Sequence, residues 1–230
     1  MLSFIVIIVL SYLIGSIPSS VWIGKLTKGV DIRDHGSGNA GATNTFRVLG
    51  WKAGSVVALV DLGKGFVAAF YISQLGFALG EMPEVLFGVW EIDASVRVVA
   101  GLSAVLGHMY PLYAGFKGGK GVITAAGMLY GIEPISISLA IIIFLIVLFS
   151  SRYVSLASIV ASISYPIFLI SLRYAFGYTE IDGSLMVIST VIALTIVVKH
   201  HGNIKRLIEG NENRIKSFAP AKGKLNEEQS

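Results

Sequence analysis

Apolar residues occur along this chain in long, uninterrupted runs, separated by short segments rich in glycine and charge. The runs that have the length of a membrane span are residues 2–22, 53–75, 96–113, 135–149, 154–172 and 184–198. A membrane-crossing helix needs about 20 apolar residues and tolerates about 17, so several runs lie at the short end of this range. The pattern predicts an all-α, polytopic integral membrane protein.

A further apolar run, residues 122–132, is too short for an ordinary span, and the distribution of charge decides how to count it. If this run crosses, every basic cluster lies on one side of the membrane, which the positive-inside tendency identifies as cytoplasmic. We therefore expect about seven transmembrane helices, some short or broken, with the N-terminus outside and the C-terminus cytoplasmic. The basic residues behind this expectation include Lys25, Lys28, Arg33, Arg47, Lys52, Lys117, Lys120, Lys199, Lys205, Arg206 and Arg214.

The composition agrees with lipid as the solvent of this chain. It is 54% hydrophobic and 14% charged, whereas a soluble domain carries about 25% charged residues. The net charge of +4 is explained by basic cytoplasmic loops, so we expect no nucleic-acid partner. There is no cysteine, and the four histidines lack metal-ligand spacing, so we expect no metal and no cofactor.

Residues 1–218 are expected to form a single transmembrane domain, followed by a disordered cytoplasmic tail, residues 219–230. The first apolar run has no basic residue ahead of it and no A-x-A-like cleavage site, so we interpret it as an uncleaved anchor. The polar end of the chain is a typical site of disorder.

The first of three polar segments, residues 36–50, opens with glycines and small residues. A short helix is predicted from about residue 40 to residue 49, stopped by a glycine. On that helix Thr43 and Arg47 lie at i and i+4, with Asn39 one turn earlier, so one face presents amide, hydroxyl and guanidinium. A helix start with exposed N–H groups favours an anion, and an arginine adds a bidentate phosphate contact. The alternative is a capped loop that only joins two spans, but such a loop needs neither the arginine nor so many side-chain hydrogen-bonding groups.

The second polar segment, residues 107–122, combines glycines with a lysine before a helix, as phosphate-binding loops do, but it does not match the Walker sequence. Lys120 supplies positive charge, and the next helix begins directly after the loop. Ala114 and Gly121 stand where the Walker sequence requires glycine and a hydroxyl residue, so nucleotide hydrolysis is not supported. His108 is assigned to packing within its span. Three glycines free the backbone to wrap around an anion: Gly118, Gly119 and Gly121.

The third polar segment, residues 199–212, places His200, Asn203 and Leu207 on one face if it continues as a helix. The alternative is a basic amphipathic helix on the membrane surface. Within the second apolar run Asp61 and Lys64 lie at i and i+3, which indicates either a functional pair or an internal ion pair. The hydroxyls that open the run at 154–172 either reach the same site or cap the helix.

Several catalytic patterns are absent from the chain. No histidine has an aspartate five positions further on, so the HX4D pattern of acyl-thioester acyltransferases is missing. No G-x-S-x-G nucleophile elbow occurs, so a covalent acyl-enzyme is not indicated.

The three polar segments, in this order, resemble those of the bacterial acyl-phosphate:glycerol-3-phosphate acyltransferase family (PlsY type). The resemblance extends over nearly the whole chain as far as residue 212, and the sequence Asp61-Leu62-x-Lys64-Gly65 is similar to the second span of the family. The matching motifs are Ser37-Gly38-Asn39-x-Gly41-x-Thr43-Asn44-x-x-Arg47, Gly107-His108-x-x-Pro111, Phe116-x-Gly118-Gly119-Lys120-Gly121 and His200-x-x-Asn203-Ile204-x-Arg206-Leu207-x-x-Gly210-x-Glu212.

The resemblance implies a seven-helix enzyme of the bacterial inner membrane, with its active site on the cytoplasmic side. Such an enzyme transfers a fatty acyl group from acyl phosphate to the sn-1 hydroxyl of glycerol 3-phosphate, giving lysophosphatidic acid and inorganic phosphate, at the first step of phospholipid biosynthesis. Its partners would be these two substrates and membrane lipids, and we expect a monomer.

Direct attack on the mixed anhydride is the mechanism we expect, with catalysis by positioning and charge stabilisation. The glycine loop would hold one phosphate, and His200 would act as general base, bind phosphate, or leave the proton to the donor's own phosphate. The residues expected to be catalytic are His200, Asn203, Ser37, Arg47 and Lys120. Those expected to bind substrate are Asn39, Thr43, Asn44, Gly118, Gly119, Gly121 and Lys64.

Two other classes compete with an enzyme. A transporter of a phosphorylated metabolite would also need glycine loops and basic residues, but such sites lie near the bilayer midplane between repeats. Here the polar segments lie at the ends of the apolar runs, and no internal repeat is visible. A membrane subunit that only scaffolds other enzymes leaves three polar segments unexplained.

Overall fold

The computed structural model describes residues 2–78, 92–179, 181 and 183–215, and all regular structure within them is helical. The predicted disordered tail, 219–230, lies outside the described residues. Shorter turns of helix occur at Ile32–Asp34 and Leu112–Ala114, and a π-helical turn joins α4 to α5 at Ala68–Ile72. The α-helices are α1 (Leu2–Gly15), α2 (Ser19–Lys28), α3 (Ala42–Leu49), α4 (Trp51–Val67), α5 (Ser73–Ala78), α6 (Ile92–Met109), α7 (Val122–Ile132), α8 (Pro134–Ser151), α9 (Val154–Ala175), α10 (Gly183–Lys199) and α11 (His201–Ile208).

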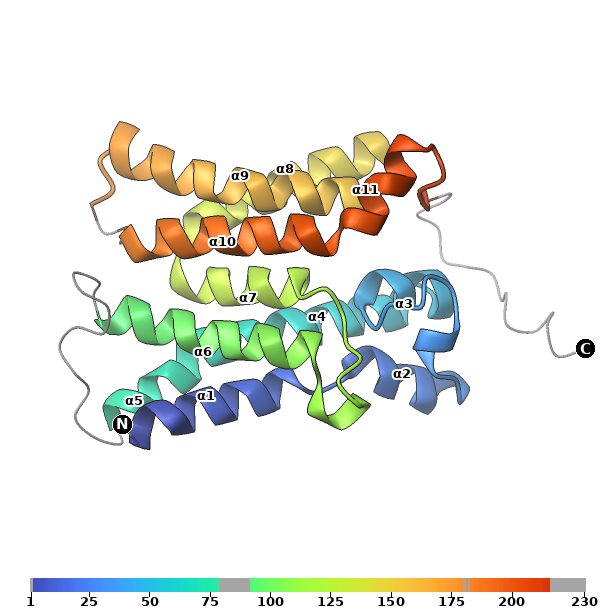
Figure 1. Ribbon diagram of the computed structural model, residues 1–230, viewed down its shortest axis with the longest axis horizontal. Coiled ribbons are helices and arrows are strands. Elements are labelled where there is room, and N and C mark those ends of the chain that lie inside the picture. The colour runs from blue at the N-terminus through green and yellow to red at the C-terminus, as the bar shows by residue number, and fades with distance from the viewer. Residues whose placement is uncertain (1, 79–91, 180, 182, 216–230) are drawn as a thin grey trace, which may run out of the picture.

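Four helical stretches among the described residues are long and apolar enough to cross a membrane, and a fifth qualifies if α10 and α11, bent by 57° at His200, are one span. The chain is therefore a multi-pass membrane protein. Helices α6 and α7 run alongside these stretches (Figure 1) but do not meet the same criterion of length and apolarity. The count of seven crossings includes both and stays a prediction. The four stretches are Ser3–Lys28, Trp51–Gly76, Pro134–Ser151 and Val154–Ala175.

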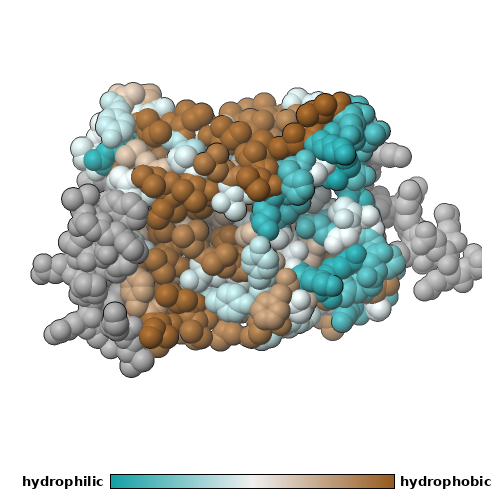
Figure 2. Space-filling model, in the orientation of Figure 1, coloured by the Kyte–Doolittle hydropathy of each residue, from teal (hydrophilic) through white to brown (hydrophobic). Residues whose placement is uncertain are grey.

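The chain reverses direction from one long helix to the next, so segments far apart in sequence meet at one end of the bundle. Helices α2, α3 and α11 and the loop before α7 all lie at this end (Figure 1). In the view of Figure 2 a broad apolar band covers the middle of the molecule, and hydrophilic residues gather at the same end. The three polar segments of the sequence thus lie together beside the apolar band.

Glycines allow the closest helix pairs to touch backbone to backbone. A Cβ on Gly65 of α4 would lie 1.9 Å from a carbonyl oxygen of α7, and one on Gly127 of α7 would lie 1.9 Å from a carbonyl oxygen of α4. Gly15 of α1 and Gly107 of α6 come as close, at 2.2 and 2.3 Å from carbonyl oxygens of the opposite helix. Because lipid gives no hydrophobic drive between helices, small residues that permit close packing stabilise such bundles.

Replacing Gly127 with alanine is expected to destabilise the protein by about 1–3 kcal/mol, because the new methyl group would force α4 and α7 apart. The fall should appear as a lower midpoint of thermal unfolding in detergent. Gly63→Ala on α4 is the matched control, since a Cβ there meets no atom within 4 Å. Equal midpoints for the two variants would show that the α4–α7 contact is not close.

Candidate active site

A chain of polar contacts at the hydrophilic end joins residues from two of the three polar segments. The ammonium of Lys120, in the loop before α7, donates to Oδ1 of Asn203 on α11. Nδ2 of Asn203 donates in turn to Oε1 of Glu212 at 2.8 Å. His200 lies at the bend between α10 and α11 and is 3% exposed. The structure therefore brings together Lys120, Asn203 and His200, which the sequence predicted as catalytic.

Glu212 organises this cluster, although it was not among the predicted site residues. Its carboxylate accepts hydrogen bonds from Ser155 at 3.0 Å, from Asn203 at 2.8 Å and from Arg206 at 2.7 Å, and its side chain is 6% exposed. Burial raises the pKa of Glu212, but the hydrogen bonds from Asn203, Arg206 and Ser155 outweigh burial and lower it overall. The ionised carboxylate thus ties the start of α9 to α11.

Three cations surround this single carboxylate. Partial desolvation lowers the pKa of Arg47, and its charge interacts with Glu212 and Arg206 across the site. Desolvation likewise lowers the pKa of Lys120, with Arg206 acting in the same direction and Glu212 against it. Mutual repulsion of Arg47, Lys120 and Arg206 is only partly balanced by one negative charge, so the site attracts an anion.

His200 is held as a neutral imidazole with one defined acceptor. Its Nδ1 lies 2.8 Å from the carbonyl oxygen of Ile196, and since a carbonyl only accepts, Nδ1 carries the proton and Nε2 is the acceptor. Desolvation and the nearby charge of Lys120 lower the pKa of His200, more than the backbone hydrogen bond and Glu212 raise it. The ring can therefore accept a proton at neutral pH.

The first polar segment is fixed by Asn44, which the sequence assigned to substrate binding. Asn44 is fully buried; its Oδ1 accepts from the backbone N–H of Ser37 at 2.8 Å, and its Nδ2 donates to the carbonyls of Ile32 and His35, both at 2.9 Å. Its amide thus holds the loop that carries Ser37. Its contacts are those of a positioning residue.

Ser37, Asn39 and Thr43 lie on this loop and the first turn of α3, and their side chains are exposed or half-buried. Within the part of the chain that the structure describes, none of the three side chains hydrogen-bonds to Lys120 or Asn203. They line the polar end without joining the cluster around Glu212.

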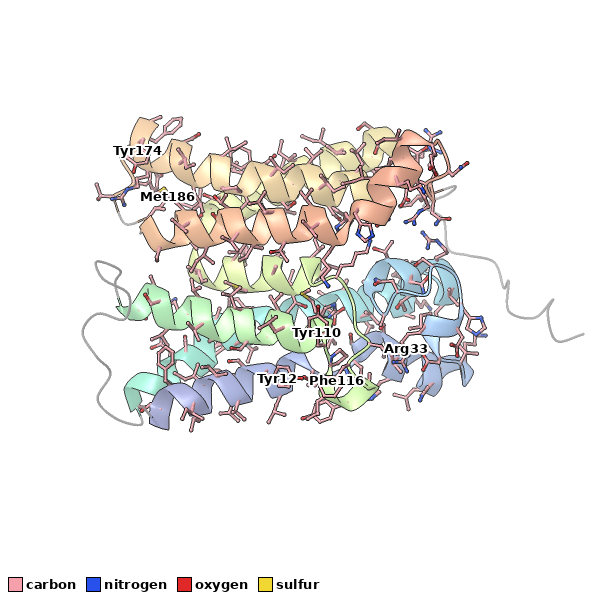
Figure 3. All side chains as sticks on the ribbon, in the orientation of Figure 1. Tyr12, Arg33, Tyr110, Phe116, Tyr174 and Met186 are labelled. Carbon is pink, nitrogen blue, oxygen red and sulfur yellow. The ribbon has the colours of Figure 1, made fainter. Side chains whose placement is uncertain are left out.

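Arg33, which precedes the first polar segment, contacts the second polar segment. Its guanidinium forms an ion pair with Asp31 at 2.7 Å and donates to the carbonyl of Ala114 at 2.8 Å. The hydrogen bond from Arg33 lowers the pKa of Asp31 to about 2. Figure 3 shows Arg33 beside the loop that precedes α7. Arg33 thus holds the outer part of that loop next to the residues that lead into the first polar segment.

The three glycines of the second segment are required by close packing against the end of α6. A Cβ on Gly118 would lie 2.0 Å from the carbonyl oxygen of His108, and one on Gly119 would lie 2.2 Å from His108 Nε2. Gly121 has φ of +80° and precedes α7 directly. Lys64 lies beneath the loop and not on its surface: it is 4% exposed and donates to Asp61 on its own helix and to the carbonyl oxygen of Ile17 between α1 and α2.

These features define a class: a multi-pass helical membrane protein with an anion site at the polar end of its bundle. The chain belongs to the glycerol-3-phosphate acyltransferase family, whose model, described by that name, matches residues 5–210. It is 47% identical over 227 residues to a glycerol-3-phosphate acyltransferase of Salinibacter ruber, covering 98% of each chain. It is 46% identical over 234 residues to that of Chlorobaculum tepidum, covering 94% of this chain and 97% of the relative.

Two solved structures are similar over most of the fold. Both are crystal structures of PlsY, an integral membrane glycerol 3-phosphate acyltransferase, and both are 39% identical to this chain. The glycerol 3-phosphate form has a TM-score of 0.77 and covers 93% of this chain and 96% of its own. The lysophosphatidic acid form has a TM-score of 0.75 and covers 93% and 95%.

Replacing Glu212 with glutamine is expected to destabilise the protein by about 2 kcal/mol at pH 7, because a charge-assisted hydrogen bond to Arg206 is lost. The folded pKa lies below the ordinary 4.5, so this stability is complete above pH 4.5 and is lost as the pH falls through the folded value. Thermal unfolding of both proteins across this pH range is the measurement. A difference that persists unchanged at low pH would contradict the role of the charge.

Proposed function

We propose that this protein transfers a fatty acyl group from acyl phosphate to the sn-1 hydroxyl of glycerol 3-phosphate, producing lysophosphatidic acid and inorganic phosphate. The observation that carries the proposal is the cluster in which Arg47, Lys120 and Arg206 face one carboxylate beside a neutral His200. Both substrates bring phosphate, and the acyl chain of the donor belongs in lipid. A cationic site beside the apolar band meets both requirements. The reaction is the first step of phospholipid biosynthesis.

The reaction consists of attack by a hydroxyl group, loss of phosphate and transfer of the hydroxyl proton. The hydroxyl oxygen of glycerol 3-phosphate attacks the acyl carbonyl carbon, the bond from that carbon to the phosphate oxygen breaks, and phosphate leaves. Nε2 of His200 receives the hydroxyl proton. Asn203 and Glu212 fix the end of α11 that follows His200. Because phosphate is a good leaving group, no covalent acyl-enzyme is needed.

Charge stabilisation falls to the basic residues and the two glycine-rich segments. Lys120 and the glycine loop hold the phosphate of the donor and stabilise it as it leaves. Arg47 completes the pocket with a planar guanidinium suited to two phosphate oxygens. The polar residues that complete this wall are Ser37, Asn39 and Thr43, while Asn44 acts by fixing the loop.

The orientation follows from the positions of the basic residues. Seven crossings, with α6 and α7 included, place the N-terminus outside and the C-terminus in the cytoplasm. The active site then faces the cytoplasm from the bacterial inner membrane, where soluble glycerol 3-phosphate has access. A monomer contains every residue assigned to the site.

An acyl-transfer assay with purified protein in lipid nanodiscs tests the proposal. We expect lysophosphatidic acid from palmitoyl phosphate and glycerol 3-phosphate, and none from palmitoyl thioesters, because only the phosphate donor matches the anion site. Folding is checked by thermal unfolding in the same nanodiscs. If folded protein forms no product from any donor, the proposed acyltransferase activity is refuted, and transport of a phosphorylated metabolite becomes the leading hypothesis.

A further inference from the structure

A buried ionic cluster lies where the break between α1 and α2 meets α4 and α6. Lys64 donates to Asp61 at 2.7 Å and to the carbonyl of Ile17 at 2.8 Å, and its ammonium lies 3.4 Å from Nδ1 of His108. Ser19 donates to the same oxygen of Asp61 at 2.6 Å. Asp61, Lys64 and His108 are each at least nine-tenths buried. Ionisable groups inside a membrane segment are costly and are retained for function.

The contacts of this cluster occupy the ammonium of Lys64. An ammonium has three hydrogens, and the described residues place three acceptors around it: Oδ1 of Asp61, the carbonyl oxygen of Ile17 and Nδ1 of His108. Nδ1 of His108 also lies 3.5 Å from Oδ1 of Asp61, so this edge of the ring faces both members of the ion pair. The carboxylate beside the ammonium compensates a charge that would be costly to bury alone.

The other edge of the His108 ring lies directly beneath the glycine loop. A Cβ on Gly119 would lie 2.2 Å from Nε2 of His108 and 2.9 Å from the carbonyl oxygen of Ala40. The backbone N–H of Gly119 donates to the carbonyl of His108 at 3.2 Å. His108 therefore touches the loop at Gly119, one residue before Lys120 and close to Ala40, which precedes α3.

We propose that His108 is a positioning residue for acyl transfer, with the Asp61–Lys64 ion pair fixing its ring and the ring fixing the glycine loop. This inference rests on the proposed function, because the loop carries Lys120 to the donor phosphate. Lys64 then acts through His108 and not on substrate. A displacement of about 1 Å at a reacting group can cost about a hundredfold in rate, which sets the scale of the effect.

A double-mutant cycle between His108 and Gly119 tests the contact. His108→Asn keeps an acceptor for Lys64 at the position of Nδ1 but removes the edge that faces Gly119. We expect Gly119→Ala to lower kcat at saturating substrate about a hundredfold in the wild-type background. In the His108→Asn background the loss should be less than about tenfold, because the 2.2 Å contact with the ring is removed and the milder 2.9 Å contact with the carbonyl oxygen of Ala40 remains. Gly63→Ala, whose Cβ meets no atom within 4 Å, should leave kcat unchanged.

Hydrogen exchange of the loop peptide around residues 116–121 gives a readout independent of catalysis. His108→Asn should speed this exchange while the thermal midpoint stays near that of the wild type, and His108→Gln, which reaches toward the loop but loses the acceptor for Lys64, should speed it less. Gly119→Ala costing the same factor in both backgrounds, with unchanged exchange in His108→Asn, would overturn the inference. A wild type that makes no lysophosphatidic acid refutes the proposed function instead, and the exchange result still decides whether His108 positions the loop.

Discussion

Replacing Lys120 with alanine is expected to lower kcat/KM for the acyl phosphate about a thousandfold, the scale found when a group that stabilises developing charge is removed. The cluster around Glu212 holds this ammonium in place through its hydrogen bond to Asn203. Its loss removes both the attraction for the donor phosphate and the stabilisation of the leaving phosphate. Steady-state kinetics with palmitoyl phosphate measure the effect.

Lys205→Ala is the matched control for the loss of one positive charge near the site. Lys205 lies on α11, two residues from Asn203, but its side chain is 77% exposed and its ion pair with Glu209 is 3.8 Å long. Exposed pairs of this kind contribute little, so kcat/KM should change less than about threefold. Comparable losses in the two variants would mean that general surface charge, and not a phosphate contact, sets the rate.

His200→Gln is expected to lower kcat by about 10²–10⁴-fold at saturating substrate, because glutamine cannot take the hydroxyl proton. The pH profile gives a second measure. Since the pKa of His200 is lowered from 6.5, the ring is neutral and competent above that value, and wild-type kcat should fall as the pH drops through the lower folded value. This acid limb should be missing in the variant.

Substantial turnover by His200→Gln, with the same acid limb as the wild type, would assign the proton to the phosphate of the donor. The thermal midpoint distinguishes a chemical loss from misfolding. His201→Gln is the control, because His201 is exposed and its Nδ1 lies 3.0 Å from a backbone carbonyl oxygen, that of Val198. Its kcat and pH profile should match those of the wild type.

The sequence was most informative where a physical rule acts locally. Run length and the distribution of lysine and arginine predicted a helical membrane protein with its polar segments at one end. The helix expected from about residue 40 to residue 49 is observed at Ala42–Leu49, with Gly50 after it. Each of these features depends on residues close together in the sequence, so no contact between helices was needed to predict it.

Features that depend on contacts between helices were not visible in the sequence. Glu212 ends the third matching motif of the sequence, but only the fold brings Ser155 to its carboxylate. Asp61 and Lys64 appeared as a pair at i and i+3, but the acceptors that occupy Lys64 come from other helices. His108 was assigned to packing because no spacing in the sequence reveals its contact with Gly119, which lies in the loop after α6.

Release of labelled phosphate tests most directly whether the acyl group passes from acyl phosphate to glycerol 3-phosphate without a covalent acyl-enzyme. Purified protein in nanodiscs is mixed with palmitoyl phosphate labelled in its phosphate, with and without glycerol 3-phosphate, in amounts close to that of the enzyme. We expect no phosphate release without glycerol 3-phosphate, and one labelled phosphate per lysophosphatidic acid with it. A burst of one phosphate per protein without glycerol 3-phosphate, leaving palmitate bound covalently to the chain, would contradict direct transfer.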